Sequence, residues 1–453
     1  MQFAKRERKQ CLRIAVVVAL LCGARAAGAT TEIAALDGRY LGQAGTGIAS
    51  SGGGAAMFHN PALLGATSSR GDFLFSPSLS YTQNSAPAAG PNQQQDTNAV
   101  SPAGFIAATY RIVPRLALGV AVQPTGGSGG KYEVNGAEIS AAAFALEADV
   151  GAAFAITDRL SVGAMYRVGY LASTSKSPDA TGGTAEASLS GADLFSFTVG
   201  AAYRFGDENN ATKLGFYYRS RISAEISGKT ETSAGKFDTT SHYALPEKFQ
   251  LGISQALLDR RLLLAAQGGL VMYGWLPGST TTTLETPAGP ASVVTVSDDM
   301  TVWEGKVGGE LWVVPETFAV RTGVWFGPEQ VRNERVSLFN SMLGFAVKPT
   351  IGAGVQFGRV GVDLGAVFGL PHGETVTSTS NGNPGEYKQG LLVSVALGLN
   401  YRFGDAGPTS GSGSVPPRAP SEASSRQGPS RRAPSEAPSP QALYRIDRTP
   451  SVH

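Results

Sequence analysis

The feature that most constrains this chain is an apolar/polar alternation of period two, which recurs from Gly71 to Phe403. Because successive side chains of a β-strand point to opposite faces, this period predicts strands with one apolar and one polar face. In the last example the apolar face consists of Leu391, Val393, Val395, Leu397, Leu399, Tyr401 and Phe403. The other face consists of Ser394, Ala396, Gly398, Asn400 and Arg402.

Fourteen such segments can be counted. They lie near 71–81, 103–112, 115–124, 147–156, 159–172, 192–205, 212–226, 247–256, 260–273, 300–313, 317–327, 347–357, 359–369 and 391–403. Their connections alternate between tight turns, such as Val113-Pro114 and Pro315-Glu316, and long polar loops of about 19 to 26 residues. An even number of strands with this alternation is typical of a transmembrane β-barrel, which closes because lipid offers no partner to an open sheet edge. A soluble sandwich, propeller or solenoid fits less well, because its loops do not alternate so regularly in length. The predicted fold is an all-β, 14-stranded antiparallel transmembrane barrel spanning 71–403.

Charged residues recur on the face opposite the apolar one. These are Arg167, Lys213, Arg219, Arg221, Lys248, Glu304, Lys306, Glu310, Arg321, Asp363 and Arg402. Each would cost roughly 2 to 4 kcal/mol on the lipid side near the membrane midplane. We therefore expect them to face a solvated lumen rather than to form one specific site.

Composition supports a membrane barrel over other classes. Only 16% of the 453 residues are charged, and no stretch outside the N-terminus approaches the ~18 to 20 apolar residues of a membrane-spanning helix. A formal charge of +2 spread along the chain does not indicate a basic surface for binding nucleic acid.

The two ends of the chain read differently from the barrel. Residues 1–29 have the basic, apolar and small-residue regions of a signal peptide and contain both cysteines, so thiol catalysis, disulfides and thiolate metal sites are excluded from the mature chain. Lipidation of Cys22 is disfavoured because Leu21 precedes it. Residues 404–453 are rich in Pro, Ser and Arg, which predicts a disordered tail. Its basic character raises the hypothesis of contact with peptidoglycan or a periplasmic protein.

The segment before the first strand, residues 30–70, is rich in small residues and lacks strand alternation. From Tyr40 to Ala66 it reads YLGQAGTGIASSGGGAAMFHNPALLGA, with Asn60, Pro61 and Ala62 near its end. This run resembles the start of the FadL-type outer-membrane transporters of long-chain fatty acids and other hydrophobic compounds, and Leu245 to Gly252 is similar to their eighth strand. The resemblance implies a hatch at 30–70 that plugs the barrel and moves at the Asn-Pro-Ala motif. It also implies a hydrophobic ligand, no cofactor, and lipid and lipopolysaccharide neighbours in the outer membrane of a Gram-negative bacterium, with the tail periplasmic.

Two departures from that family stand out. The acidic stretch that often precedes Asn-Pro-Ala is replaced by Ser50 to Ala56, which leaves a charge-dependent hatch movement in doubt. The chain also continues for about fifty residues beyond Phe403, where many outer-membrane barrels end.

The third strand meets Pro124-Thr125-Gly126. The resemblance implies that a break in this strand opens the barrel wall sideways, with Pro124 and Gly126 at the break. Proline removes one ladder hydrogen bond, but it also commonly ends a strand, so the residues themselves leave both interpretations open.

No residue pattern indicates an enzyme or a metal site. The four histidines, His59, His242, His372 and His453, have no zinc-like spacing, and we expect them to be exposed in loops. The Gly126 to Gly130 run matches G-x-S-x-G without the strand-to-helix context that a nucleophile needs. The leading hypothesis is passive, hatch-gated uptake of long-chain fatty acids or other hydrophobic compounds with lateral exit into the bilayer. The alternatives are a general porin for small polar solutes and a structural outer-membrane protein with a periplasmic tether.

Overall fold

The computed structural model describes residues 36–405 apart from Ser68, Asn135, Ala180, Glu208, Asn209, Ala288 and Ser297. The predicted signal peptide and all but the first residues of the predicted tail lie outside the described residues.

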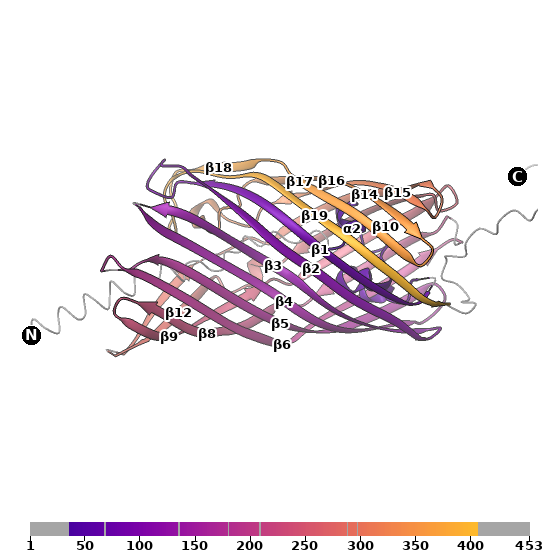
Figure 1. Cartoon of the computed structure of the whole chain (residues 1–453), viewed down its shortest axis with the longest axis horizontal. Helices are drawn as coiled ribbons and strands as arrows, with labels where there is room; N and C mark the ends of the chain where they lie inside the picture. The colour runs from indigo at the N-terminus through magenta and orange to yellow at the C-terminus, as the bar shows by residue number, and fades with distance from the viewer. Residues whose placement is uncertain are drawn as a thin grey trace, which may run out of the picture. The chain divides into compact units, whose positions relative to one another are not determined.

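A closed antiparallel barrel makes up most of the described chain (Figure 1). Its nineteen described strands are β1 (Ser69–Ala86), β2 (Gln95–Val113), β3 (Leu116–Val134), β4 (Ala137–Ala155), β5 (Leu160–Pro178), β6 (Thr184–Phe205), β7 (Thr212–Arg219), β8 (Ile222–Thr232), β9 (Gly235–Leu245), β10 (Lys248–Leu257), β11 (Leu262–Val271), β12 (Ser279–Thr286), β13 (Gly289–Val296), β14 (Val302–Val314), β15 (Phe318–Pro328), β16 (Phe345–Phe357), β17 (Val360–Gly369), β18 (His372–Val376) and β19 (Gly385–Asp405). Five wall crossings consist of two strands each, namely β7 with β8, β9 with β10, β11 with β12, β13 with β14, and β17 with β18. The described strands therefore make fourteen crossings, as predicted. The barrel closes where β1 pairs with both β2 and β19.

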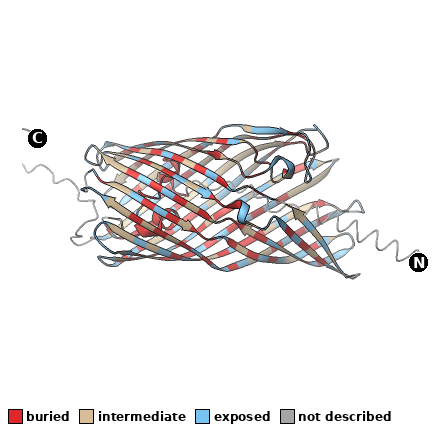
Figure 2. Cartoon of the chain, turned by 180° about the vertical axis from the view of Figure 1, so that it is seen from behind, coloured by how far each residue is buried: buried red, intermediate tan, exposed pale blue. Residues whose placement is uncertain are grey.

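In the membrane-spanning part of the barrel, the apolar residues lie on the outer face and the residues of the other face point inward, as predicted. In β19, Leu397, Leu399 and Tyr401 are exposed on the outside while Ala396 is buried, and the same alternation of buried and exposed positions runs along the wall in Figure 2. An outer face of large apolar side chains around a closed sheet is a transmembrane surface. Within the described residues, no helix is long and apolar enough to cross a membrane.

Aromatic side chains form two rows on the outer face. Toward the long loops, one row consists of Phe197, Tyr218 and Phe249 on β6, β7 and β10 and of Trp275 in the short turn η3 (Tyr273–Trp275) after β11, with successive ring centroids 4.7 to 6.2 Å apart. Near the short turns, Tyr110 and Phe403 stack at 6.3 Å. Two such rows mark the two membrane–water interfaces of a β-barrel.

Several strands extend beyond the predicted limits toward the long loops. β6 begins at Thr184 rather than near residue 192, and the hairpins β8–β9 and β12–β13 include segments expected as loop. The polarity of the wall inverts here, because the outer face meets water. Cross-strand ion pairs such as Lys229–Asp238 (3.2 Å) lie outside. A buried apolar cluster lies inside and is called the upper lining: Ala143, Ala145, Leu171, Leu189, Ile222, Ala224, Ile226, Tyr243 and Leu245.

One inner-face prediction is wrong. Arg221 is exposed and pairs with Glu247 at 3.1 Å, because the break between β7 and β8 at Ser220 and Arg221 shifts the alternation by one residue. Of the other predicted charges, Lys213, Asp363 and Arg402 are partly buried. The buried ones are Arg167, Arg219, Lys248, Glu304, Lys306, Glu310 and Arg321.

Candidate functional site

The segment before β1 lies inside the barrel and is called the hatch, residues 36–67. It contains four short helical turns: α2 (Gly38–Leu41), η1 (Gly53–Ala55), α3 (Ala56–His59) and η2 (Pro61–Leu63). Most of its side chains are buried, and several join a core with wall residues such as Leu74, Phe105 and Ala396.

Inward-facing glycines of the wall allow the hatch backbone to approach the strands. At each of these positions, a Cβ atom would lie within about 3 Å of a hatch atom. The wall glycines are Gly119, Gly163, Gly200, Gly215, Gly252, Gly308, Gly323, Gly352 and Gly365, each on a different strand. The hatch therefore packs closely against the wall at many points, through its backbone at positions such as Gly215 and Gly308 and through the side chains of Met57 and Asn60 at Gly119 and Gly200.

The predicted hatch motif docks against β5 and β6. The Asn60 Nδ2 group donates to the carbonyl oxygens of Ile48 (2.8 Å) and Ala201 (3.2 Å), while its Oδ1 accepts from the amide of Ala62 (3.1 Å). Pro61 begins η2, where its missing N–H costs no helical hydrogen bond, and its backbone lies against Gly163. Asn60 thus joins two parts of the hatch to the wall. The role of residues 60–62 in gating stays a prediction.

An ion-pair network around the buried Glu310 carboxylate also ties the hatch to the wall. Arg39 donates to both carboxylate oxygens of Glu310, at 2.9 and 2.7 Å. Arg321 donates to the same carboxylate at 2.7 Å and pairs with Asp363 at 2.8 Å. We call these four residues the Glu310 clasp. Their mutual pairing corrects the expectation that the inner charges simply face a solvated lumen.

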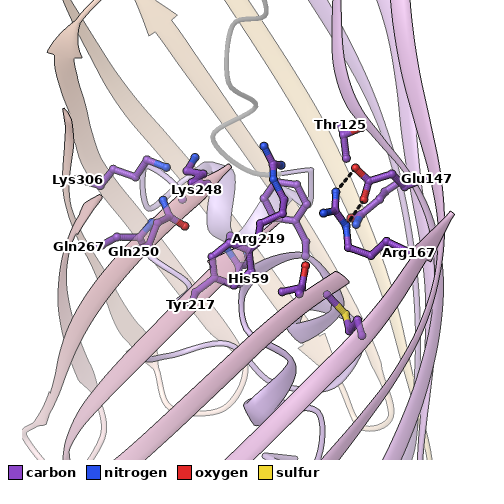
Figure 3. A pocket seen from close by; sticks show the side chains of 15 residues that line it. His59, Thr125, Glu147, Arg167, Tyr217, Arg219, Lys248, Gln250, Gln267 and Lys306 are labelled. Atoms are coloured by element: carbon purple, nitrogen blue, oxygen red, sulfur yellow. Dashed lines mark hydrogen bonds and ion pairs between the residues drawn. The ribbon is translucent and has the colours of Figure 1, made fainter. Parts of the chain in front are cut away.

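A cavity of about 450 Å³, part of it open, lies beside the hatch and is called the central pocket (Figure 3). It is lined by Gly45, Phe58, His59, Gln123, Thr125, Glu147, Met165, Arg167, Thr198, Tyr217, Arg219, Lys248, Gln250, Gln267 and Lys306. Four of these carry a positive charge and one a negative charge. Arg167 is paired with Glu147, and Lys248 and Lys306 contact Glu304 at 2.9 and 3.4 Å. The pocket is therefore polar and predominantly cationic.

His59 is a pocket residue that the sequence analysis placed wrongly. It is buried within the hatch, its ring lies 4.7 Å from that of Tyr40, and its Nε2 atom is 3.7 Å from Asp37 Oδ2. Burial lowers the pKa of His59, and the nearby Asp37 carboxylate opposes this shift in part. Its position next to Asn60 was the one signal that could have indicated burial.

The third strand does not end at Pro124. β3 continues to Val134 and pairs with β4 throughout, with a bulge at Thr125 between Pro124 and Gly126. Pairing between β2 and β3 instead stops at Ile106 and Val122.

Contact between β2 and β3 resumes nearer the loop end. There the amides of Lys131 and Glu133 donate to the side chains of Thr97 (3.2 Å) and Gln95 (3.1 Å). The β2–β3 ladder is thus interrupted beside the bulge. Gln123 and Thr125, which line the central pocket, lie at this interruption.

The residues that the structure describes contain no cluster of three or more His, Cys, Asp or Glu side chains that could hold a metal ion.

Comparison with solved structures identifies the fold. No family model matches the chain, and no curated protein matches it. A Pseudomonas aeruginosa FadL homologue aligns with a TM-score of 0.68 at 15% identity, covering 83% of this chain and 100% of its own. The Ralstonia pickettii toluene transporter TbuX aligns with a TM-score of 0.63 at 16% identity (82% and 99% covered), and the Pseudomonas putida toluene transporter TodX with 0.63 at 15% (82% and 100%). The chain therefore has the fold of these FadL-type barrels.

Proposed function

We propose that this protein is a passive transporter in the outer membrane of a Gram-negative bacterium that takes up hydrophobic compounds and releases them sideways into the bilayer. The observation that carries the proposal is the interrupted β2–β3 ladder beside a pocket whose other side is the hatch. The shared fold with a FadL homologue and two toluene transporters supports it.

The order of surfaces along the barrel suits a hydrophobic solute. The upper lining offers buried apolar contacts on the side of the long loops, where a poorly soluble molecule would arrive. The central pocket follows, and the hatch lies beyond it. Because the hatch packs closely against the wall at many points, we infer that exit occurs at the wall beside Thr125 rather than through the hatch.

The central pocket favours a substrate with an acidic head group. Arg167, Arg219, Lys248 and Lys306 line it, against the two carboxylates of Glu147 and Glu304, which pair with Arg167 and with the two lysines. A cationic, largely desolvated pocket binds a carboxylate better than a neutral hydrocarbon. We therefore propose long-chain fatty acids as the substrate class, with the acyl chain against the apolar upper lining.

A general porin is the second candidate, since the lumen carries many charges. The tight fit of the hatch argues against a continuous water path, but small-ion flow would reveal one. The third candidate, a periplasmic tether, depends on residues 406–453, which lie outside the described part of the chain.

The test is uptake of labelled oleate and of labelled decane by a deletion strain with and without the gene. We expect gene-dependent uptake of oleate that exceeds that of decane. Uptake of decane alone would support transport but contradict the preference for an acidic head group. Uptake of neither compound would refute the proposed function. Steady ion conductance of the purified protein in planar bilayers would favour the porin instead.

A further inference from the structure

A second pocket lies in the barrel wall, away from the β2–β3 interruption. It lies between the loop-side ends of β11, β14, β15 and β16 and is called the wall pocket; its empty space, which includes open solvent, is about 430 Å³. Its lining is Val271, Tyr273, Val302, Trp303, Glu304, Trp325, Phe326, Gly327, Pro328, Glu329, Gln330, Ala346 and Lys348.

The wall pocket is lined from both faces of the sheet. Trp303 and Phe326 belong to the outer face, with rings 6.1 Å apart, while Trp325, Ala346 and Lys348 belong to the inner face. Side chains of both faces can line the pocket because the β14–β15 pairing ends at Gly305 and Phe326, one residue before Gly327. An apolar ring could therefore be enclosed here by side chains of both faces.

Two buried carboxylates in the pocket have an oxygen with spare hydrogen-bonding capacity. No described residue donates a hydrogen bond to Glu304 Oε2, and Glu329 Oε1 has only long contacts with Lys348 Nζ (3.7 Å) and His372 Nε2 (3.4 Å), although the two carboxylate side chains are only 5% and 10% exposed. A buried acceptor left without a donor is unfavourable by about 1 to 3 kcal/mol, so such groups usually have a bound partner.

The charges near Glu329 restrict what that partner can be. Lys348 Nζ lies 3.7 Å from Glu329 Oε1 and 4.2 Å from the centre of the Trp325 ring, and His372 Nε2 lies 3.4 Å from the same oxygen. A carboxylate ligand would be repelled by Glu304 and Glu329, and an ammonium ligand by Lys348. A hydroxyl group suits both sides, because it donates to the carboxylate and accepts from the ammonium group.

We propose that the wall pocket binds the ring of a phenol, or of a similar small hydroxylated hydrophobic compound, with the hydroxyl between Glu329 and Lys348. This inference rests on the proposed function and adds a substrate class to it. Trp303, Trp325 and Phe326 supply the ring contacts, and Glu329 Oε1 supplies the acceptor that distinguishes a phenol from a hydrocarbon of the same shape.

The test compares p-cresol with p-xylene, which differ by a hydroxyl in place of a methyl group. Binding of each is measured on the purified full-length protein by ligand-observed NMR and calorimetry. We expect p-cresol to bind roughly tenfold more tightly, as one charge-assisted hydrogen bond predicts. In Glu329→Gln this preference should fall severalfold while p-xylene binding is unchanged.

A second test fills the wall pocket with a larger side chain. Ala346 is buried in the lining, so Ala346→Leu should abolish binding of both probes, whereas Ala353→Leu on the outer face of the same strand should leave both unchanged. Equal binding of the two probes to the wild type, or full binding to a folded Ala346→Leu, would overturn the proposal. If Ala346→Leu does not fold, the p-cresol preference of the Glu329→Gln variant still tests the proposal. Gene-dependent uptake of oleate without a p-cresol preference would remove this site alone, and a p-cresol preference without any uptake would remove the transport function alone.

Discussion

The side-chain oxygen of Asn60 lies close to where a Cβ atom at position 200 would stand, so the hatch turn packs its side chain directly against the backbone of β6. Together with the hydrogen bond from Asn60 to the carbonyl oxygen of Ala201, this contact fixes the position of the hatch along the barrel axis.

We predict that Gly200→Ala displaces the hatch without unfolding the barrel. The added methyl group collides with the buried Asn60 side chain, and overpacking of this kind costs about 1 to 3 kcal/mol. Faster hydrogen exchange of residues 36–67 would show the displacement. Gly104→Ala is the matched control, because nothing lies within 4 Å of a Cβ there, and equal exchange in the two variants would contradict the contact.

The Glu310 clasp should contribute strongly to hatch docking. Glu310→Gln leaves Arg39 and Arg321 without their shared buried carboxylate, and loss of one partner of a buried pair costs roughly 3 to 5 kcal/mol. We expect the hatch of this variant to become protease-sensitive at lower urea concentration than in the wild type. Asp238→Asn breaks the exposed pair with Lys229 and should have almost no effect. An unchanged urea profile in Glu310→Gln would show that the clasp does not hold the hatch.

The sequence predicts the membrane-spanning part well because lipid requires apolar side chains on the outer face of every strand. Apolar outer residues such as Leu397 and polar inner ones such as Arg321 are forced into alternation, so the crossings can be counted. Beyond the aromatic row the outer face meets water and this requirement no longer holds. That is why β12, with the sequence STTTTLET, reads as loop although it is a strand.

The site could not be predicted from local patterns because it is built from distant residues. Arg39 and Glu310 are 271 positions apart, and nothing in either neighbourhood indicates the pairing. The burial of His59 follows from the fold of a hatch that has no periodic pattern. Whether Pro124 ends a strand or accompanies a bulge depends on β4, which continues to pair with β3 beyond it.

The buried His59 makes hatch docking dependent on pH. Burial lowers the pKa of His59 in the folded protein below its ordinary value of 6.5, so the docked hatch holds the neutral ring. An undocked hatch takes up a proton more readily, and docking is therefore fully stable above about pH 6.5 and is lost progressively as pH falls below it. Protection factors of residues 36–67, measured at about pH 5 and pH 7.5, should differ in the wild type and much less in His59→Asn. A pH profile identical in both proteins would assign the effect to other groups.

Lateral exit predicts that repairing the β2–β3 ladder blocks transport. Thr125 is the extra residue of the bulge, and its deletion brings Pro124 and Gly126 into regular alternation, outward and then inward, opposite Leu146 and Ala145. With Pro124→Val added to restore the missing N–H, we expect pairing with β2 to continue past Val122. Oleate uptake should then fall to the level of the strain without the gene.

The control for this variant is deletion of Val313, the extra residue of a bulge at the short-turn end of β14, far along that strand from Glu304. Both proteins must show the heat-dependent gel shift of a folded barrel before their uptake is compared. A disulfide that forms between cysteines placed at Gly104 and residue 124 of the repaired protein would establish that the strands have closed. Normal uptake by a barrel closed in this way would place the exit elsewhere, because the path beside Thr125 would no longer exist.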